Sequence, residues 1–260
     1  MKIIACYSNK GGVGKTAAAV NLAYAYAQSG ARTLLCDLDP QGASSFYFRV
    51  KPSKKLKDTQ FFEDVDRFTR AIRGSDYENL DILPANLTFR DFDVFLSRMK
   101  NSRSRLKKAL KAVDGDYDVI ILDCPPNISS LSEAVFKAAD RVVVPVIPTT
   151  LSERSFEQLF AFFKESGLKT AKLLTFFSMV QGRKTLHGET MARLRDSYGK
   201  LFLSTELPFS TDVEKMGVYR EPALCFARTR PAGRAYLALF DEVNAHVSGG
   251  KTAMRTKGSP

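Results

Sequence analysis

A glycine-rich segment near the start of the chain has the composition of a phosphate-binding loop. Residues 8–16 read Ser-Asn-Lys-Gly-Gly-Val-Gly-Lys-Thr, between an apolar stretch that predicts a strand and an alanine-rich stretch that predicts a helix. Glycines allow successive backbone N–H groups to surround phosphate oxygens, and the start of the following helix adds the positive end of its dipole. The sequence therefore predicts a nucleotide site at this loop.

Individual residues of the loop have distinct chemistry. Lys15 supplies a cation for β- and γ-phosphates, and Thr16 supplies a hydroxyl that can ligate Mg²⁺. The strict phosphate-loop pattern has glycine where this chain has Asn9, and a second lysine, Lys10, stands beside it. The expected nucleotide-binding residues of the loop are Lys10, Gly11, Gly12, Val13, Gly14, Lys15, Thr16 and Ala17.

Three aspartates follow two other predicted strands. Asp37 ends the apolar stretch 32–37, Asp39 lies two residues further on, and Asp123 ends the clearest apolar stretch, 117–123. The carboxyl ends of parallel strands form the edge at which open α/β sheets bind ligands. Asp123 is expected to hold Mg²⁺ through water. Spacing alone leaves open which of Asp37 and Asp39 supports the metal and which orients an attacking water.

The chain as a whole alternates predicted strands with predicted helices. Strands are expected at 2–7, 32–37, 80–84, 117–123, 141–147, 171–180 and 201–207, and helices at 17–28, 61–72, 89–113, 129–139, 152–165, 184–198 and 231–247. This alternation predicts an α/β fold with a mostly parallel twisted sheet and helices on both faces. We expect one phosphate-loop NTPase domain over residues 1–247 and a flexible tail at 248–260.

Composition narrows the class of protein further. The 260 residues are 44% hydrophobic, which suffices for one large core, and no apolar run approaches the roughly 20 residues of a membrane span. The four cysteines are widely spaced, which favours reduced thiols in a cytoplasmic protein over disulfides or a cysteine-bound metal. The charged start leads directly into a predicted strand, so no secretory signal is expected.

The charge balance is strongly basic. A net charge of +11 and an isoelectric point near 9.5 favour a polyanionic partner, either nucleic acid or an anionic membrane surface, and charge alone does not choose between them. Residues 98–111 contain seven lysines and arginines and no acidic residue. This basic helix fits either a solvated face or a binding surface.

Three motifs together resemble those of the ParA/MinD family of deviant Walker A ATPases, most closely its short ParA/Soj branch. They are Lys10-Gly-Gly-Val-Gly-Lys-Thr16, Asp37-Leu-Asp-Pro-Gln-Gly42 and Asp123-Cys-Pro-Pro126. The resemblance implies a Mg²⁺-dependent ATPase that forms a homodimer around ATP. Within it, Lys10 would reach the phosphates of the partner subunit.

The resemblance also implies a role for each acidic residue and a place for the base. Asp39 would position the attacking water, Asp37 would support the metal, and Asp123 would be the Walker B acid. The adenine would lie near Met179 and Pro208.

A partitioning or positioning function follows from the same resemblance. The ATP-bound dimer would bind nucleoid DNA without sequence preference, and an adaptor protein would stimulate hydrolysis and release. The cargo would be a plasmid, a chromosome or a protein assembly. The basic residues expected to contact DNA phosphates are Arg220, Arg228, Arg230 and Arg234.

Two alternatives have weaker support in the sequence. A MinD-like membrane-cycling ATPase would end in an amphipathic helix, whereas Met254 is the only bulky apolar side chain of residues 251–260. A metal-cluster carrier would need paired cysteines at its dimer interface, and Cys124 has no suitable second cysteine in the sequence.

Overall fold

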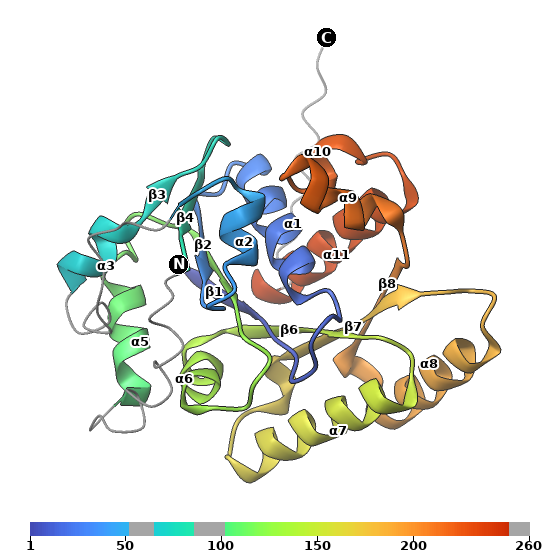
Figure 1. Cartoon of the computed structure of the whole chain (residues 1–260). Helices are drawn as coiled ribbons and strands as arrows, with labels where there is room; N and C mark the ends of the chain where they lie inside the picture. Colours follow the sequence, from blue (N-terminus) through green and yellow to red (C-terminus); the bar gives the residue numbers. More distant parts are fainter. Residues whose placement is uncertain (52–64, 86–101, 250–260) are drawn as a thin grey trace.

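The computed structural model describes residues 1–51, 65–85 and 102–249 (Figure 1). The first part of the predicted helix 61–72, the first part of the predicted helical stretch 89–113 and nearly all of the predicted tail lie outside these ranges. Within them, the seven predicted strands are present and the predicted α/β class is confirmed.

The described strands form one eight-stranded sheet in the order β3-β4-β2-β5-β1-β6-β7-β8. Neighbouring strands are parallel except β3 and β4, which pair antiparallel. Their bounds are β1 Lys2–Cys6, β2 Thr33–Asp37, β3 Arg73–Gly74, β4 Leu80–Leu83, β5 Val119–Asp123, β6 Arg141–Val146, β7 Leu173–Val180 and β8 Phe202–Pro208. The central strands are covered on both faces, which explains their continuous apolar runs.

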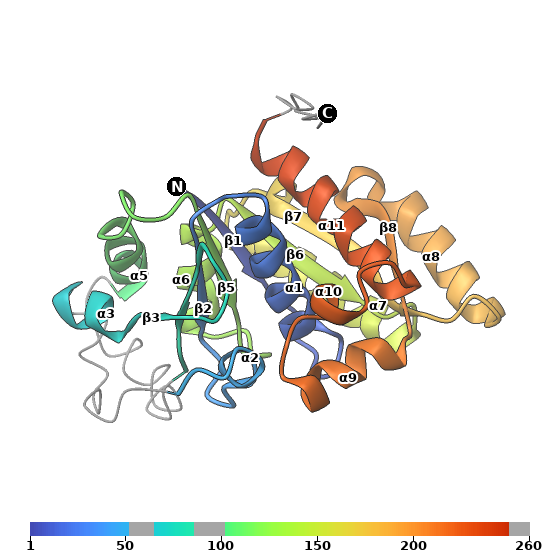
Figure 2. The same cartoon turned by 90° about the horizontal axis from the view of Figure 1, so that it is seen from above.

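Helices pack on both faces of this sheet (Figures 1 and 2). One face buries apolar residues against α1 and α11, and the other against α5, α6, α7 and α8. The helix bounds are α1 Lys15–Gln28, α2 Ala43–Tyr47, α3 Val65–Ala71, α5 Ser102–Lys111, α6 Ser130–Ala138, α7 Thr150–Glu165, α8 Thr185–Tyr198, α9 Thr211–Tyr219, α10 Ala223–Phe226 and α11 Pro231–Val247. The structure is therefore a single α/β domain with two apolar cores.

Four short elements were not expected from the sequence. The helices α2 and α10 have five and four residues, too few to show an apolar period, and β3 has only two residues. The nine-residue helix α9 begins with a recognisable signal, because the Ser210 side chain accepts a hydrogen bond from the Asp212 N–H. Helices α2 and α10 have no side-chain cap, so this signal was available for α9 alone.

The loop between α10 and α11 crosses helix α11 at very close range. An ideal Cβ built on Gly233 would lie 2.1 Å from the Ala227 carbonyl oxygen. Only a residue without a side chain fits this crossing. Gly233 therefore sets the course of the segment that carries Arg228 and Arg230.

Replacing Gly233 by alanine should destabilise the fold, because the new methyl group would overlap backbone atoms that cannot rotate away. We expect a loss of about 1–3 kcal/mol in the free energy of unfolding. Thermal unfolding followed by circular dichroism measures it. Gly217→Ala in α9 is the matched control, since a Cβ there meets nothing within 4 Å. Equal melting temperatures for the two variants would contradict the close crossing.

Candidate nucleotide-binding site

The glycine-rich loop joins β1 to α1 and is shaped by two glycines with positive φ. Gly12 has φ +70° and Gly14 has φ +96°, conformations in which side chains are strained. Gly14 is the N-cap residue of α1, and an ideal Cβ on it would lie 3.1 Å from the Ser178 Oγ atom. The loop is thus pressed against the end of β7 at Gly14.

The space over the loop suits a phosphate group. Ideal Cβ atoms built on Gly11 and Gly12 meet no atom within 4 Å, so the described chain leaves room above both residues. Helix α1 has no side-chain cap and no acidic residue in its first turn. Its first N–H groups therefore remain available to an anion, as at other phosphate-binding helix starts.

Lys15 lies largely buried at the start of α1. Its Nζ atom donates a hydrogen bond to the Lys10 carbonyl oxygen at 3.2 Å. Burial lowers the pKa of the Lys15 ammonium, while the nearby carboxylates of Asp123 and Asp39 oppose that shift. A desolvated ammonium among hydrogen-bond acceptors is well placed to exchange the loop carbonyl for a phosphate oxygen.

The Lys10 side chain contacts helix α7 of the same chain. Its Nζ atom donates to the Ser152 Oγ atom at 3.0 Å, in the first turn of α7. The neighbouring Asn9 amide donates to the Gln158 side chain at 3.4 Å, which also lies on α7. The Lys10 side chain is therefore held by a neutral hydroxyl on α7.

Asp37 and Asp123 lie opposite each other at the ends of β2 and β5, where the two strands pair in register. Both side chains are fully buried. Burial raises the pKa of the Asp37 carboxyl, and the Asp123 carboxylate raises it further. Burial also raises the pKa of the Asp123 carboxyl, although the nearby hydroxyls of Ser44 and Thr16 oppose that rise. Carrying both negative charges is therefore costly for this pair, and a bound cation would offset that cost.

A magnesium ion fits these residues chemically. The Oδ1 atoms of Asp37 and Asp123 are both buried and accept no hydrogen bond in the described part of the chain. Carboxylate oxygens and a threonine hydroxyl are ligands that Mg²⁺ prefers. The described residues contain no cluster of three or more His, Cys, Asp or Glu side chains able to cage a metal. Mg²⁺ usually takes its remaining ligands from water and nucleotide phosphates.

Two serines that contact the buried aspartates were missed by sequence reasoning. Ser44 and Ser45, in the short helix α2, donate hydrogen bonds to Asp123 and Asp37 respectively. Two hydroxyl residues directly after Gly42 were the available signal. They could not be assigned to either carboxylate without knowing the fold.

Asp39 lies outside the buried pair, at the mouth of the site. Its side chain is partly exposed, and its Oδ1 atom accepts a hydrogen bond from the Gln41 N–H at 3.0 Å. Its carbonyl oxygen accepts from the Gly42 N–H, so residues 39–42 form a turn. A partly exposed carboxylate remains accessible to water, and the role of Asp39 in orienting that water stays a prediction.

The two residues expected near adenine do lie together. Met179 and Pro208 line one small cavity of about 60 Å³, which Gly14 also lines. Met179 takes a positive φ of 55°, unusual for a residue with a side chain. The cavity therefore adjoins the phosphate loop, and its position is compatible with a base bound beside the loop.

The four arginines that we expect to contact DNA phosphates differ in their surroundings. Arg228 and Arg234 are exposed, and the described chain gives neither an ion-pair partner. Arg230 forms an ion pair with Asp212 at 2.7 Å. The Arg220 guanidinium stacks over the Phe46 ring with its carbon 4.6 Å from the centroid. Two of the four therefore already have partners within the protein.

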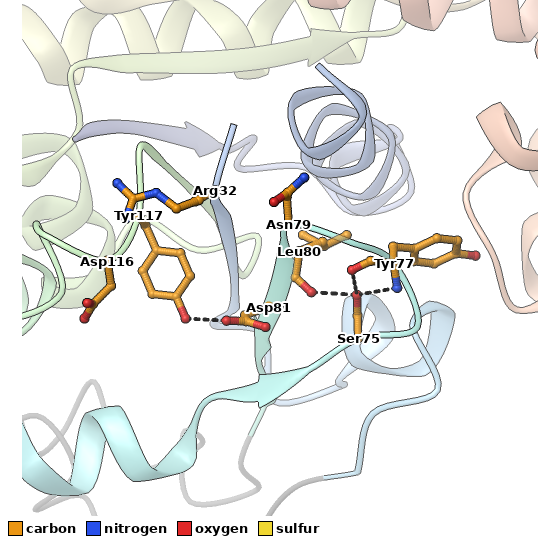
Figure 3. Close-up of a pocket in the computed structure, with 8 residues that line it drawn as sticks. All are labelled: Arg32, Ser75, Tyr77, Asn79, Leu80, Asp81, Asp116 and Tyr117. Atoms are coloured by element: carbon orange, nitrogen blue, oxygen red, sulfur yellow. Dashed lines mark hydrogen bonds between the residues drawn. The ribbon is translucent and has the colours of Figure 1, made fainter. Parts of the chain in front are cut away.

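A larger cavity of about 320 Å³ lies at the other end of the strands, away from the glycine-rich loop (Figure 3). Its lining comes from the amino ends of β2, β4 and β5. Figure 3 shows the Tyr117 hydroxyl bonded to Asp81 and the Ser75 hydroxyl bonded to main-chain atoms. The Arg32 guanidinium is paired with Asp118. Most polar groups of this cavity thus already have hydrogen-bond partners. We therefore place the candidate nucleotide site at the carboxyl ends of the strands, where the glycine-rich loop lies.

Comparisons with known proteins agree with this geometry. The AAA domain family model matches residues 1–176. The chromosome-partitioning ATPase Soj of Thermus thermophilus is 31% identical over 248 residues, which cover 94% of this chain and 96% of that relative. The chain belongs to the ParA/Soj/MinD family of ATPases.

Further members and structures support the nucleotide site. The chromosome partitioning protein ParA of Caulobacter vibrioides is 28% identical over 254 residues, 94% of each chain. A crystal structure of cobyrinic acid a,c-diamide synthase from Mycobacterium smegmatis holds an ATP analogue and magnesium. It is 26% identical, has a TM-score of 0.77, and the match covers 96% of this chain and 97% of that one. This ATPase thus shares its fold with a structure that contains Mg²⁺ and a nucleotide.

Replacing Asp37 by asparagine should stabilise the protein without nucleotide while weakening Mg²⁺ binding. The change removes one of two buried like charges on adjacent strands, worth on the order of 1 kcal/mol or more. Thermal unfolding in EDTA should show a higher melting temperature than the unchanged protein. Asp81→Asn, at the opposite edge, is the control. A melting temperature equal to or below that of the unchanged protein would show that the pair is not strained.

Proposed function

We propose that this chain is an ATP-dependent, dimerising ATPase that binds DNA without sequence preference and partitions or positions a cargo. The main support is the arrangement at the carboxyl ends of the strands. There a phosphate loop with two lysines lies next to a buried pair of carboxylates. Relatives named as chromosome-partitioning proteins over nearly their full length support the cellular role. ATP and Mg²⁺ are the proposed ligands, with Lys10, Lys15 and Asp39 as the proposed catalytic residues.

Exposed apolar side chains favour a dimer whose interface covers the glycine-rich loop and the carboxyl ends of the strands. The large apolar residues exposed in the described chain lie in segments that follow the carboxyl ends of strands. They are Phe46, Ile128, Leu151, Leu186, Phe209, Val218 and Tyr219. Exposed apolar surface of this kind is what the contact with another protein covers. A second copy of the chain, approaching across the nucleotide, would cover it.

The contact between Lys10 and Ser152 bears on when the dimer forms. For Lys10 to reach a partner's phosphates, its Nζ atom has to leave the Ser152 hydroxyl, 3.0 Å away. A charged hydrogen bond of this kind is worth about 1.5–3 kcal/mol when buried and less when partly exposed. In this proposal the hydroxyl restrains Lys10 until a second nucleotide-loaded subunit arrives.

Ser152→Ala should therefore promote ATP-dependent dimerisation, because Lys10 loses its partner within the chain. A gain of about 1 kcal/mol corresponds to roughly a fivefold lower dimer dissociation constant. Size-exclusion chromatography with light scattering, in ATP and Mg²⁺, measures this constant. Ser155→Ala is the matched control, since its hydroxyl bonds only the Leu151 carbonyl on the same helix. Weaker dimerisation of the Ser152 variant would overturn the restraint.

Basic side chains on the C-terminal segment support DNA as the polyanionic partner. Arg228 and Arg234 are exposed close together in sequence, on either side of the start of α11. The net charge of +11 adds a general attraction to phosphate. Contacts to phosphates carry no sequence information, which matches non-specific binding.

Arg228→Ala and Arg234→Ala should each weaken binding to unrelated duplexes and lower the salt slope of the logarithm of affinity by about 1. Fluorescence anisotropy with an ATP analogue and Mg²⁺ measures both quantities. Arg230→Ala is the contrasting variant, because it leaves the Asp212 carboxylate unpaired and should lower the melting temperature. An unchanged salt slope in the Arg228 and Arg234 variants would remove them from a DNA interface.

Asp39→Ala should slow ATP turnover and leave nucleotide binding and dimerisation intact. Loss of a group that orients the attacking water reduces the rate on the order of 100-fold. The expected result is a long-lived DNA-bound state, seen as slower dissociation after dilution into excess competitor DNA. A phosphate-release assay gives the rate, and normal hydrolysis would exclude Asp39 from the reaction. The same variant would serve to capture the adaptor protein that stimulates hydrolysis.

The two alternative functions have less support. No helix in the described ranges is both long and apolar enough to cross a membrane. All four cysteines are free thiols, and three of them, Cys6, Cys36 and Cys124, are buried. The proposed place of action, the nucleoid in the cytoplasm, follows from the proposed binding to DNA.

A further inference from the structure

The short helix α2 brings two consecutive hydroxyls onto the two buried carboxylates. The Ser44 Oγ atom donates to the Asp123 Oδ2 atom at 2.6 Å. The Asp37 Oδ2 atom accepts from both the Ser45 N–H at 2.8 Å and the Ser45 Oγ atom at 2.7 Å. All four side chains are buried, so water does not compete for these bonds.

The hydrogen bonds engage the same oxygen of each carboxylate. Both Oδ2 atoms are used, and both Oδ1 atoms accept no bond in the described chain. The Ser45 hydroxyl also accepts from the Ala85 N–H at 3.0 Å. Because that bond occupies a lone pair of the Ser45 oxygen, the hydroxyl proton is directed to Asp37. The two serines thereby fix the orientation of both carboxylates.

Helix α2 does not hold this position by itself. A five-residue helix is unstable without tertiary contacts. The Arg220 Nε atom donates to the Phe46 carbonyl oxygen at 3.1 Å, and its guanidinium covers the Phe46 ring. Arg49 in turn donates to the Arg220 carbonyl oxygen at 2.8 Å. Both arginines have positive φ, a strained conformation that these contacts maintain.

We propose that Ser44 and Ser45 are positioning residues for Mg²⁺: they hold Asp123 and Asp37 so that one oxygen of each stays available to the metal. The proposal rests on the proposed Mg²⁺-nucleotide function of this site. Partners that orient metal-binding carboxylates typically change metal affinity 10- to 100-fold when they are removed. Arg220 supports this arrangement by holding α2 in place.

The test measures binding of a non-hydrolysable fluorescent ATP analogue while Mg²⁺ is titrated, with Ser44→Ala and Ser45→Ala. Each variant should need about 10-fold more Mg²⁺ for half-maximal binding, while its affinity for the analogue in EDTA stays unchanged. Ser45→Thr, which keeps the hydroxyl, should restore the Mg²⁺ requirement. Ser75→Ala is the matched control, because that hydroxyl bonds main-chain atoms at the opposite edge of the sheet.

The outcomes separate this proposal from the function on which it rests. If the unchanged protein binds the analogue with Mg²⁺ and the alanine variants show the same Mg²⁺ dependence, the serines do not position the carboxylates. Equal losses in Mg²⁺ and in EDTA would also overturn the proposal, since they indicate general damage to the fold. If the unchanged protein binds no analogue under either condition, the proposed function itself fails.

Discussion

Two carboxylates buried side by side at the ends of β2 and β5 are the constraint on which this site depends. Parallel pairing in register places Asp37 opposite Asp123, and burial makes the charged form of each costly. Neighbouring groups partly offset this negative charge. Lys15 lies close to Asp123, and two serine hydroxyls donate hydrogen bonds to the two carboxylates. A cation bound between the two carboxylates would offset their repulsion, and their free oxygens are of the kind that Mg²⁺ prefers.

The side chains of the site lie at the carboxyl ends of the sheet's strands or in short segments that follow them. The phosphate loop follows β1, helix α2 follows β2, and α9 follows β8. Arg220 connects α9 to α2 through Phe46, and the Arg230–Asp212 ion pair connects α9 to α11. The segment that carries Arg230 is therefore linked through α9 to helix α2, which contacts Asp37 and Asp123.

Much of the site could be predicted because its chemistry is local. The loop around Lys15 and Thr16 lies within nine residues, and each aspartate ends a strand whose apolar run is plain in the sequence. The pairing of Ser44 with Asp123, 79 residues apart, carries no such local signal. The partners of Arg220 and Arg230 could not be predicted either, because Phe46 and Asp212 lie far from them in sequence.

The sequence by itself determined the α/β class, the strand and helix alternation and the residues of the phosphate loop, since these depend on apolar period and on glycine spacing. Only the tertiary structure decided the strand order, the in-register pair of Asp37 and Asp123, and the contact of Lys10 with Ser152. It also separated the exposed Arg228 and Arg234 from arginines with internal partners. Contacts between distant segments are set by how the whole chain packs, and no short stretch of sequence specifies them.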